Sequence, residues 1–480
     1  MSAFDEIVFF VSAAMFVYFV VYTLATFALI GLSLYEAAIV RIERGELFSP
    51  PLRLRRPGVS LIAPAFNMEA LIVASVRSLL ASDYEPLEVL IVDDGSTDGT
   101  TAALIAGFDL VEQPVGDRHA IPTAPIADAY ISRSDPRLRV MRKENGGRSD
   151  AINAGLNVAR YELVATVDAD TLLERDALKR AVEVFAADPD NVVAVGGTIR
   201  IANGAVIRDE TVTEARISPA GIEASQTAEY LRGFLGGRIA WSAINGLLVI
   251  SGAFGVFRSD LLRAAGGLSK QTLGEDMEIV MRLHHRLRPQ RPQTRVAYAD
   301  DATAWTEAPT SLAPLRGQRI RWHVGLFDNV LIHRQMILRR RYGAVGLVAL
   351  PYTIAFEAVG PLLQAADYCI LVLLIVLNQA SWLYVIPAFV LTLLVGQLQT
   401  AGAIAVEETA FRRYRSRDLI LLGCWSLLEL LWYRPLTAIW RTWATVLVIT
   451  GRRPGWGTIP RGAALREELE PELTPAPLPR

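Results

Sequence analysis

Two acidic residues that could hold a nucleotide follow an apolar, strand-like run early in the chain. Asp93 and Asp94 end the run LEVLIVD and precede the turn residues Gly95 and Ser96. At the carboxyl end of a strand, where open α/β sheets bind ligands, carboxylates can accept hydrogen bonds from a base N–H and from ribose hydroxyls. The alternative is an ordinary turn in which Ser96 or Thr97 caps the next helix.

A second acidic pair, Asp168 and Asp170, comes after the apolar run YELVATV. Alternation along an extended segment places these two carboxylates on the same side. Their hard oxygen ligands suit Mg²⁺ or Mn²⁺, which could bridge to donor phosphates and neutralise a leaving diphosphate. A cap at the end of the strand is the alternative.

The glycine-rich segment ENGGRSDAINAGL, residues 144–156, lies between the two acidic pairs. Its glycines allow a ligand to approach the backbone closely, and a helix is predicted to begin just beyond them. A helix N-terminus beside Arg148 suits a diphosphate. A plain turn before an amphipathic helix explains the same residues.

A third acidic pair, Glu275 and Asp276, opens the predicted helix that continues MEIVMRLHHR. One of these carboxylates could act as a general base on an acceptor hydroxyl. Alternatively, both could simply complement the helix dipole.

An arginine-rich stretch, LRGQRIRWHVG, contains Gln318, Arg321 and Trp322. Helical spacing puts Gln318 and Arg321 on one face. Arginine can hold phosphate, and tryptophan can stack on a sugar ring. An interfacial amphipathic helix with an aromatic anchor is the alternative, and the two roles are compatible.

The elements that must position these residues alternate between strand and helix over residues 57–340. The exception is an irregular insertion at 107–136, which could be a lid and which we expect to be a surface loop. Such alternation predicts an α/β domain with a mostly parallel sheet covered on both faces. The predicted strands are 59–66, 87–93, 137–142, 161–168, 191–201 and 247–257.

The N-terminal segment is predicted to anchor the chain in a membrane. Residues 7–35 carry no charged side chain, and as a helix they would span roughly 44 Å, more than a hydrocarbon core of ~30 Å. Asp5 and Glu6 precede the segment, which argues against a cleaved signal peptide. Arginines follow it, so the positive-inside rule places the N-terminus outside and residue 41 onward in the cytoplasm.

Further apolar segments occupy residues 346–378, 382–405 and 418–450. We expect three to four C-terminal transmembrane helices, with 418–450 forming either two short spans or one span and an interfacial helix. Glu357 and Asp367 lie within the first segment. Because acids are costly in a membrane, they should face the protein interior or a wet cavity.

Composition excludes several other classes. The chain has 480 residues, is 52% hydrophobic and carries a formal net charge of −2. No global basic field points to nucleic acid, which is not an expected partner. The two cysteines, Cys369 and Cys424, lie in hydrophobic runs, so neither a disulfide framework nor a cysteine metal site is expected.

In this order, VDDGS, DAD, GED and QRIRW resemble the motifs of the membrane-integrated family 2 inverting glycosyltransferases. That group includes cellulose, hyaluronan, chitin-oligosaccharide and poly-N-acetylglucosamine synthases. The resemblance covers about residues 57–330. It implies a GT-A (Rossmann-like) domain, a UDP-sugar donor and Mg²⁺ or Mn²⁺. Family members often have lysine at the place of Arg148 and threonine at the place of Gly274.

The resemblance also implies a role for each motif residue. The nucleotide would be bound by Asp93, Asp94 and Arg148, the metal by Asp168 and Asp170, and the acceptor proton by Asp276. The residues bordering the acceptor or the diphosphate would be Ser251, Gly252, Glu275, Gln318, Arg321 and Trp322.

These expectations combine into a processive, inverting β-glycosyltransferase of the inner membrane, with UDP-N-acetylglucosamine as the first donor to test. Its partners would be the donor, a glycan or lipid-linked acceptor, and membrane lipids. One alternative is transfer of a single sugar to a lipid or short glycan. Another is a catalytically inactive membrane scaffold or sensor with a GT-A fold.

The expected domain organisation has five parts, and no PilZ-type regulatory domain is expected after residue 463. The parts are an anchor at 1–40, the catalytic domain at 57–308, an interfacial region with the QRIRW motif at 309–341, a membrane region at 346–450 and a disordered tail at 463–480.

Overall fold

The computed structural model describes residues 3–47, 56–115, 120–208, 211–378, 381–453 and 455. The predicted tail at 463–480 lies outside the described residues. One large sheet forms the centre of the domain, and a two-stranded sheet lies apart from it.

The large sheet has ten strands in the order β3-β4-β5-β2-β1-β6-β11-β8-β12-β7. Their bounds are β1 (Val59–Ala65), β2 (Leu87–Asp93), β3 (Leu110–Gln113), β4 (Ile126–Ser132), β5 (Leu138–Lys143), β6 (Leu163–Val167), β7 (Leu172–Leu173), β8 (Val192–Ile201), β11 (Phe254–Arg258) and β12 (Arg295–Thr306). The small sheet pairs β9 (Val206–Arg208) with β10 (Thr211–Glu214).

The four neighbouring strands β5, β2, β1 and β6 are parallel, as are β8 and β12. The remaining pairings are antiparallel. The predicted α/β sheet is therefore confirmed, with its parallel part at the centre. In these central strands Val59 lies opposite both Leu87 and Leu163, so β2 and β6 end at the same edge.

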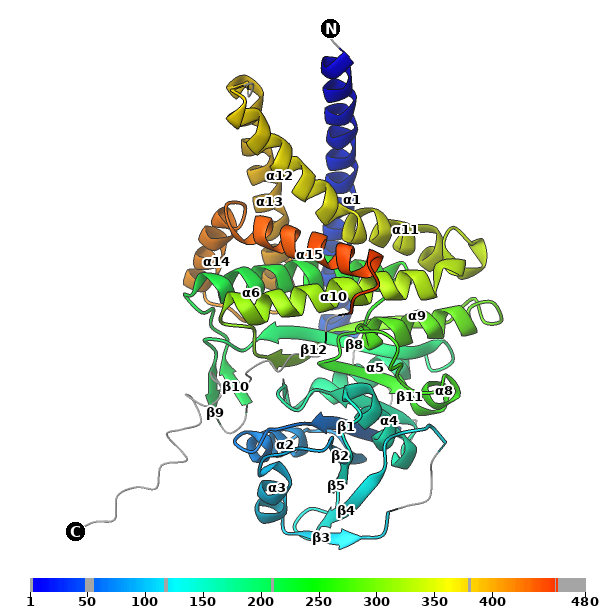
Figure 1. Cartoon of the computed structure of the whole chain (residues 1–480). Coiled ribbons are helices and arrows are strands. Elements are labelled where there is room, and N and C mark those ends of the chain that lie inside the picture. Colours follow the sequence, from blue (N-terminus) through cyan, green and yellow to red (C-terminus); the bar gives the residue numbers. More distant parts are fainter. Residues whose placement is uncertain are drawn as a thin grey trace, which may run out of the picture.

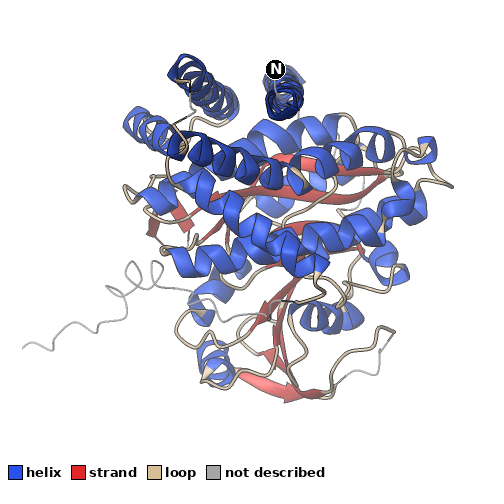
Figure 2. Ribbon diagram, turned by 45° about the horizontal axis from the view of Figure 1, so that its top comes forward, coloured by secondary structure: helices blue, strands red, loops and turns tan. Residues whose placement is uncertain are grey.

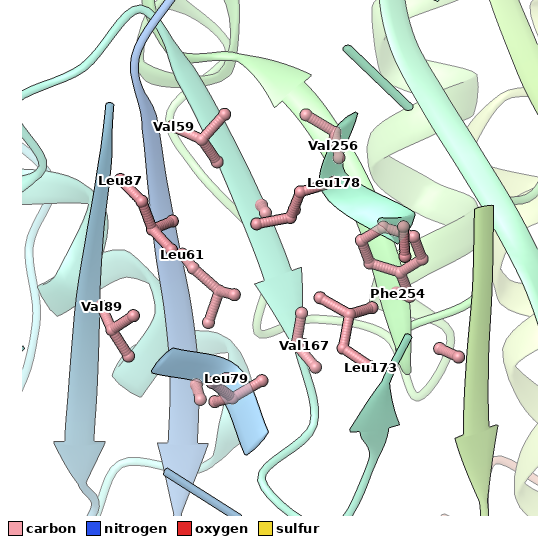
Figure 3. Packing of buried hydrophobic residues seen from close by; sticks show 14 of the residues in the cluster. Val59, Leu61, Leu79, Leu87, Val89, Val167, Leu173, Leu178, Phe254 and Val256 are labelled. Atoms are coloured by element: carbon pink, nitrogen blue, oxygen red, sulfur yellow. The ribbon is translucent and has the colours of Figure 1, made fainter. Parts of the chain in front are cut away.

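Helices cover both faces of the sheet (Figure 2). The helices of this layer are α2 (Ile72–Leu80), α3 (Thr100–Phe108), α4 (Arg148–Val158), α5 (Ala177–Ala187), α8 (Ser259–Ala264) and α9 (Glu275–Leu287). Adjacent residues of β1 point to opposite faces. Leu61 belongs to the apolar cluster that includes Leu79 of α2 and Leu178 of α5 (Figure 3), whereas Ile62 belongs to the cluster that includes residues of α4 and α9. Burial on both faces explains why the central strands are continuously apolar.

Two predictions about the strands are wrong. Residues 107–136 do not form an irregular loop, because β3 and β4 within them extend the sheet by antiparallel pairing. Residues 247–253 are not a strand, since β11 begins only at Phe254.

A second group of helices lies toward one side of the domain. It comprises α1 (Ala3–Leu47), α6 (Gly221–Gly233), α7 (Ile239–Ala243), α10 (Leu312–Ile332), α11 (Leu350–Tyr352), α12 (Gly360–Val376), α13 (Trp382–Ala410), α14 (Ser416–Leu428) and α15 (Tyr433–Ile449). The π-helical turns are η1 (Phe234–Arg238), η4 (Val345–Ala349) and η5 (Thr353–Ala358), and the 3-10 turns are η2 (Arg334–Met336) and η3 (Arg340–Tyr342).

Three helical segments of the described chain are long and apolar enough to cross a membrane: 13–39, 345–376 and 385–410. Figure 1 shows α1, α12 and α13 projecting from the same side of the domain. The pair α14 and α15 passes the same test only as one span bent by 60° at a break. The number of C-terminal transmembrane helices in the described chain reaches the predicted three only if this bent pair crosses the membrane.

Three helices, α6, α10 and α15, run between the sheet and the projecting helices (Figure 1). Arg319 of α10 pairs with Glu229 of α6 at 2.8 Å and donates to the Tyr433 hydroxyl of α15 at 2.9 Å. One buried arginine thereby connects all three helices of this layer.

The acids of the first C-terminal apolar segment, Glu357 and Asp367, are both exposed among the described residues. Arg441 of α15 lies next to Glu357 and donates a hydrogen bond to its backbone carbonyl oxygen at 2.7 Å. Of the two predicted surroundings, the exposure argues against the protein interior, and a wet cavity stays a prediction.

Candidate active site

The first acidic residue of VDDGS shapes the turn that follows β2. Asp93 is fully buried. Its Oδ1 atom accepts a hydrogen bond from the Ser96 backbone N–H at 2.9 Å, and its Oδ2 atom accepts one from the Thr101 hydroxyl. These contacts connect the end of β2 to α3.

The second acidic residue, Asp94, holds the glycine-rich segment. Its carboxylate accepts hydrogen bonds from the backbone N–H groups of Gly146 and Gly147 at 3.0 and 2.7 Å. Gly147 has a φ of 87°, a left-handed conformation that favours glycine. Asp94 therefore fixes the backbone that leads into α4, and a direct contact with the nucleotide stays a prediction.

A buried lysine that the sequence interpretation missed completes this network. Lys143, at the end of β5, has a fully buried side chain that pairs with Asp94 at 2.6 Å and with Asp150 at 2.7 Å. Asp150 also pairs with Lys270, in the loop before α9. The signal available in the sequence was a lysine at the inward position of a strand, next to the glycine-rich segment.

Arg148, the first residue of α4, joins three motifs that are far apart in sequence. Its Nε atom donates to Asp168 Oδ1 at 2.7 Å, and its Nη1 atom donates to Glu275 Oε1 at 2.8 Å. Its Nη2 atom donates to the Gly252 carbonyl oxygen at 2.6 Å. The guanidinium therefore bonds to one residue of the predicted metal pair and to two residues predicted to border the acceptor or the diphosphate.

The acidic pair Asp168 and Asp170 follows β6, as predicted. The Thr171 backbone N–H bonds to the Asp168 carbonyl at 3.0 Å, which closes the turn. Both acidic side chains are partly exposed. Within the described ranges, no cluster of three or more His, Cys, Asp or Glu residues suits a metal. Two carboxylates nevertheless fit Mg²⁺ or Mn²⁺, because such ions often take their other ligands from phosphates and water.

The two acids that open α9 have different surroundings. Glu275 is buried, and burial raises the pKa of its carboxyl while the Arg148 guanidinium opposes that rise. Asp276 is partly exposed; it accepts hydrogen bonds from the backbone N–H groups of Gly252 at 3.2 Å and of Met277 at 2.8 Å. Asp276 is thus the more accessible acid and contacts Gly252, which the resemblance assigns to the acceptor or diphosphate; these roles stay predictions.

The QRIRW residues lie on α10. Trp322 is 47% exposed. Its ring centroid lies 4.5 Å from the Arg319 guanidinium and 6.5 Å from the ring centroid of Tyr230 in α6. Gln318 has a buried Oε1 atom that no described residue hydrogen-bonds, and Arg321 is partly exposed one turn away. The sequence interpretation missed Arg319, which is the most buried arginine of the motif.

The motif helix α10 also contacts the base residues through the loop before α9. The side-chain amide of Asn329 donates to the Gly274 carbonyl oxygen at 2.7 Å. A Cβ on Gly274 would lie 2.9 Å from that amide and 3.3 Å from the Gly325 backbone. This close approach explains glycine where the family resemblance suggests threonine.

Comparison with known proteins agrees with this geometry. The sequence model of a family described as "Glycosyltransferase like family 2" matches residues 57–325, more than half of the chain. Poly-beta-1,6-N-acetyl-D-glucosamine synthase of Staphylococcus aureus is 28% identical over 269 residues, which are 56% of this chain and 54% of that protein. The enzyme of the same name from Staphylococcus epidermidis is 27% identical over 269 residues. The chain thus matches about half the length of these curated relatives.

The solved structures that the chain matches have lower sequence identity. A mannosyltransferase from Pyrobaculum calidifontis, in complex with GDP-Man and Mn²⁺, has 20% identity and a TM-score of 0.48, and the alignment covers 92% of this chain and 100% of that one. Residues 1–349 of TarS from S. aureus, in complex with UDP-GlcNAc, have 16% identity and a TM-score of 0.36, with 84% and 95% covered.

Proposed function

The chain belongs to the glycosyltransferase-like family 2, and on this premise we propose that it is a processive, inverting β-glycosyltransferase of the inner membrane. Its first candidate donor is UDP-N-acetylglucosamine, because the names of the curated relatives give N-acetyl-D-glucosamine as the unit of their polymer. The observation that carries the proposal is the convergence on Arg148 of Asp168, Glu275 and Gly252, with Asp276 beside them.

In the proposed reaction, Asp276 takes the proton from an acceptor hydroxyl. The hydroxyl oxygen attacks the anomeric carbon of the donor from the side opposite to UDP. The new glycosidic bond forms as the bond between that carbon and the UDP oxygen breaks, so the configuration inverts. The backbone N–H groups of Gly252 and Met277 orient the Asp276 carboxylate for this role.

Donor binding is assigned to the other end of the site. Asp94 and Lys143 hold the glycine-rich turn so that the N-terminus of α4 and Arg148 can face a diphosphate. Asp168 and Asp170 would hold Mg²⁺ or Mn²⁺, and when bound the cation would neutralise the charge of the leaving diphosphate.

The acceptor and product are assigned to the side of the domain that faces the membrane. Trp322 exposes part of its indole, which offers a flat face to a sugar ring. Helices α1, α12 and α13 project beyond this layer (Figure 1), and we propose that the polymer leaves among them while the domain stays in the cytoplasm. Cytoplasmic UDP-sugars then have direct access to the donor site.

The test is a screen of UDP-sugars for UDP release by the full chain in detergent, followed by sizing of the product. Release of UDP from UDP-N-acetylglucosamine together with a long β-linked polymer is the expected result. Products of one added sugar would instead establish the single-transfer alternative. If no donor released UDP with glycan and lipid acceptors present, the result would support the alternative of an inactive scaffold or sensor.

A further inference from the structure

The contacts of Arg148 raise the question of how a cation could reach Asp168. Arg148 has 16% of its side chain exposed, Asp168 has 22% and Glu275 has 6%, so these charges meet with little water between them. The bonded atoms Arg148 Nε and Asp168 Oδ1 are 2.7 Å apart. The Coulomb attraction between charges shielded in this way is stronger than between charges at a protein surface.

A metal ion would compete for the same carboxylate. Mg²⁺ binds carboxylate oxygen at about 2.0–2.1 Å and accepts little departure from octahedral geometry. A guanidinium on the Asp168 carboxylate would therefore repel the ion at close range. It would also restrict the orientation of the carboxylate that the ion needs.

We propose that Arg148 occupies the cation position of the donor-free enzyme and that Mg²⁺ or Mn²⁺ binds at Asp168 only once a nucleotide diphosphate draws the guanidinium away. This inference rests on the proposed metal role of Asp168 and Asp170. A diphosphate is a suitable alternative partner, because the planar fork of arginine binds phosphate oxygens in pairs. Metal and nucleotide then bind with positive coupling, and each strengthens the other by the same factor.

Arginine is better suited to this function than lysine. The three donors that contact Asp168, Glu275 and the Gly252 carbonyl belong to one rigid planar group. A lysine ammonium is a single point of charge and cannot reproduce that fork. A lysine at position 148 should therefore hold Asp168 less firmly.

The experiment measures Mn²⁺ binding directly, from the electron paramagnetic resonance signal of the free ion, with and without UDP. The variants are Arg148→Met, Arg148→Lys and, as a matched control, Arg258→Met. Arg258 lies opposite Leu163, at the other end of β6 from Asp168. We expect Arg148→Met to bind Mn²⁺ about ten-fold more tightly than the parent without UDP, and Arg148→Lys to be intermediate. The control should match the parent.

UDP provides a second measurement that needs no variant. In the parent chain, UDP should tighten Mn²⁺ binding by about ten-fold or more, and in Arg148→Met it should tighten binding less. If Arg148→Met does not fold, as judged by its melting temperature, Arg148→Lys carries the test, measured against the parent with and without UDP.

The outcomes separate this inference from the proposed metal site. Equal or weaker Mn²⁺ binding by the Arg148 variants without UDP would overturn the competition while leaving the metal site intact. Undiminished Mn²⁺ binding by Asp170→Ala in the presence of UDP would instead remove the metal site itself.

Discussion

At the scale of single residues, the neighbouring acids Glu275 and Asp276 differ in their partners and in how accessible they are. Glu275 is buried against Arg148, whereas Asp276 is partly exposed and accepts one backbone N–H hydrogen bond on each carboxylate oxygen. A group that must exchange a proton with a substrate has to be accessible to it. The structure therefore favours Asp276 as the base and Glu275 as the acid that positions Arg148.

Removing metal should suppress UDP release. EDTA takes away the ion, and Asp170→Ala takes away one ligand, so the charge of the leaving diphosphate is poorly neutralised in both cases. We expect both treatments to abolish most turnover, and Mg²⁺ or Mn²⁺ to restore only the EDTA-treated parent. Full activity of the metal-free chain would show that Asp168 and Asp170 serve another purpose.

Trp322→Ala should affect the acceptor more than the donor. Trp322 contacts Tyr230 and Arg319 rather than the residues assigned to UDP. We expect UDP affinity within a few-fold of the parent and a loss of elongation, measured as product length. Trp443, on α15, is the matched control because it is 53% exposed against 47% for Trp322. Equal polymer yield from Trp322→Ala and Trp443→Ala would show that Trp322 does not bind the acceptor and serves only as an anchor at the membrane interface.

At the scale of elements, the sequence predicted the strands whose positions follow from a local apolar pattern. The strands β1, β2 and β6 are continuously apolar and buried, so their positions were predicted correctly. The edge strands β3 and β4 contain polar and half-buried residues next to prolines, and β12 is interrupted where its register shifts between Ala299 and Thr303. Such strands form because they pair and pack with neighbouring strands, and a local sequence pattern does not contain that information.

Close packing between α10 and the loop before α9 should be essential for activity. A Cβ on Gly325 would lie 2.7 Å from the Gly274 backbone N atom and 2.9 Å from its Cα atom. Gly325→Ala must therefore move the loop that carries Glu275 and Asp276, at a cost of about 1–3 kcal/mol. We expect a lower melting temperature and reduced UDP release.

Gly233→Ala on α6 is the control for this prediction, because its Cβ would meet nothing within 4 Å. Gly233→Ala should keep the melting temperature and turnover of the parent. If Gly325→Ala behaved in the same way, the contact between α10 and the loop would not position the base.

At the scale of the whole molecule, the site depends on contacts between distant segments. The motifs were recognisable one by one, and their order indicated the family. Their convergence on Arg148, the Lys143 pairing with Asp94, and the Arg319 pairing with Glu229 all link separate segments of the chain. None of these pairings follows from spacing, because each depends on the order of strands and on how α10 lies across the domain.

The arrangement of the projecting helices predicts a topology. Ser134 lies exposed in the turn between β4 and β5, and Ser381 lies exposed between the end of α12 and the start of α13. Helices α12 and α13 project from the domain (Figure 1). In a background with Cys369→Ala and Cys424→Ala, a cysteine at position 381 should react with an impermeant reagent in intact cells. A cysteine at position 134 should react only after permeabilisation. Labelling of position 134 in intact cells would reverse the assigned orientation.

The most direct test of the whole account pairs UDP binding with turnover in Asp276→Asn. Asparagine keeps the size and hydrogen bonding of the side chain but cannot take a proton at neutral pH. Loss of a general base typically slows a reaction by about 10²–10⁴-fold, while UDP should still bind because its site is assigned to the other acids. Glu275→Gln is the companion variant. We predict that Asp276→Asn loses turnover and retains UDP affinity; near-normal turnover by Asp276→Asn would contradict the assignment of the base and the reaction built on it.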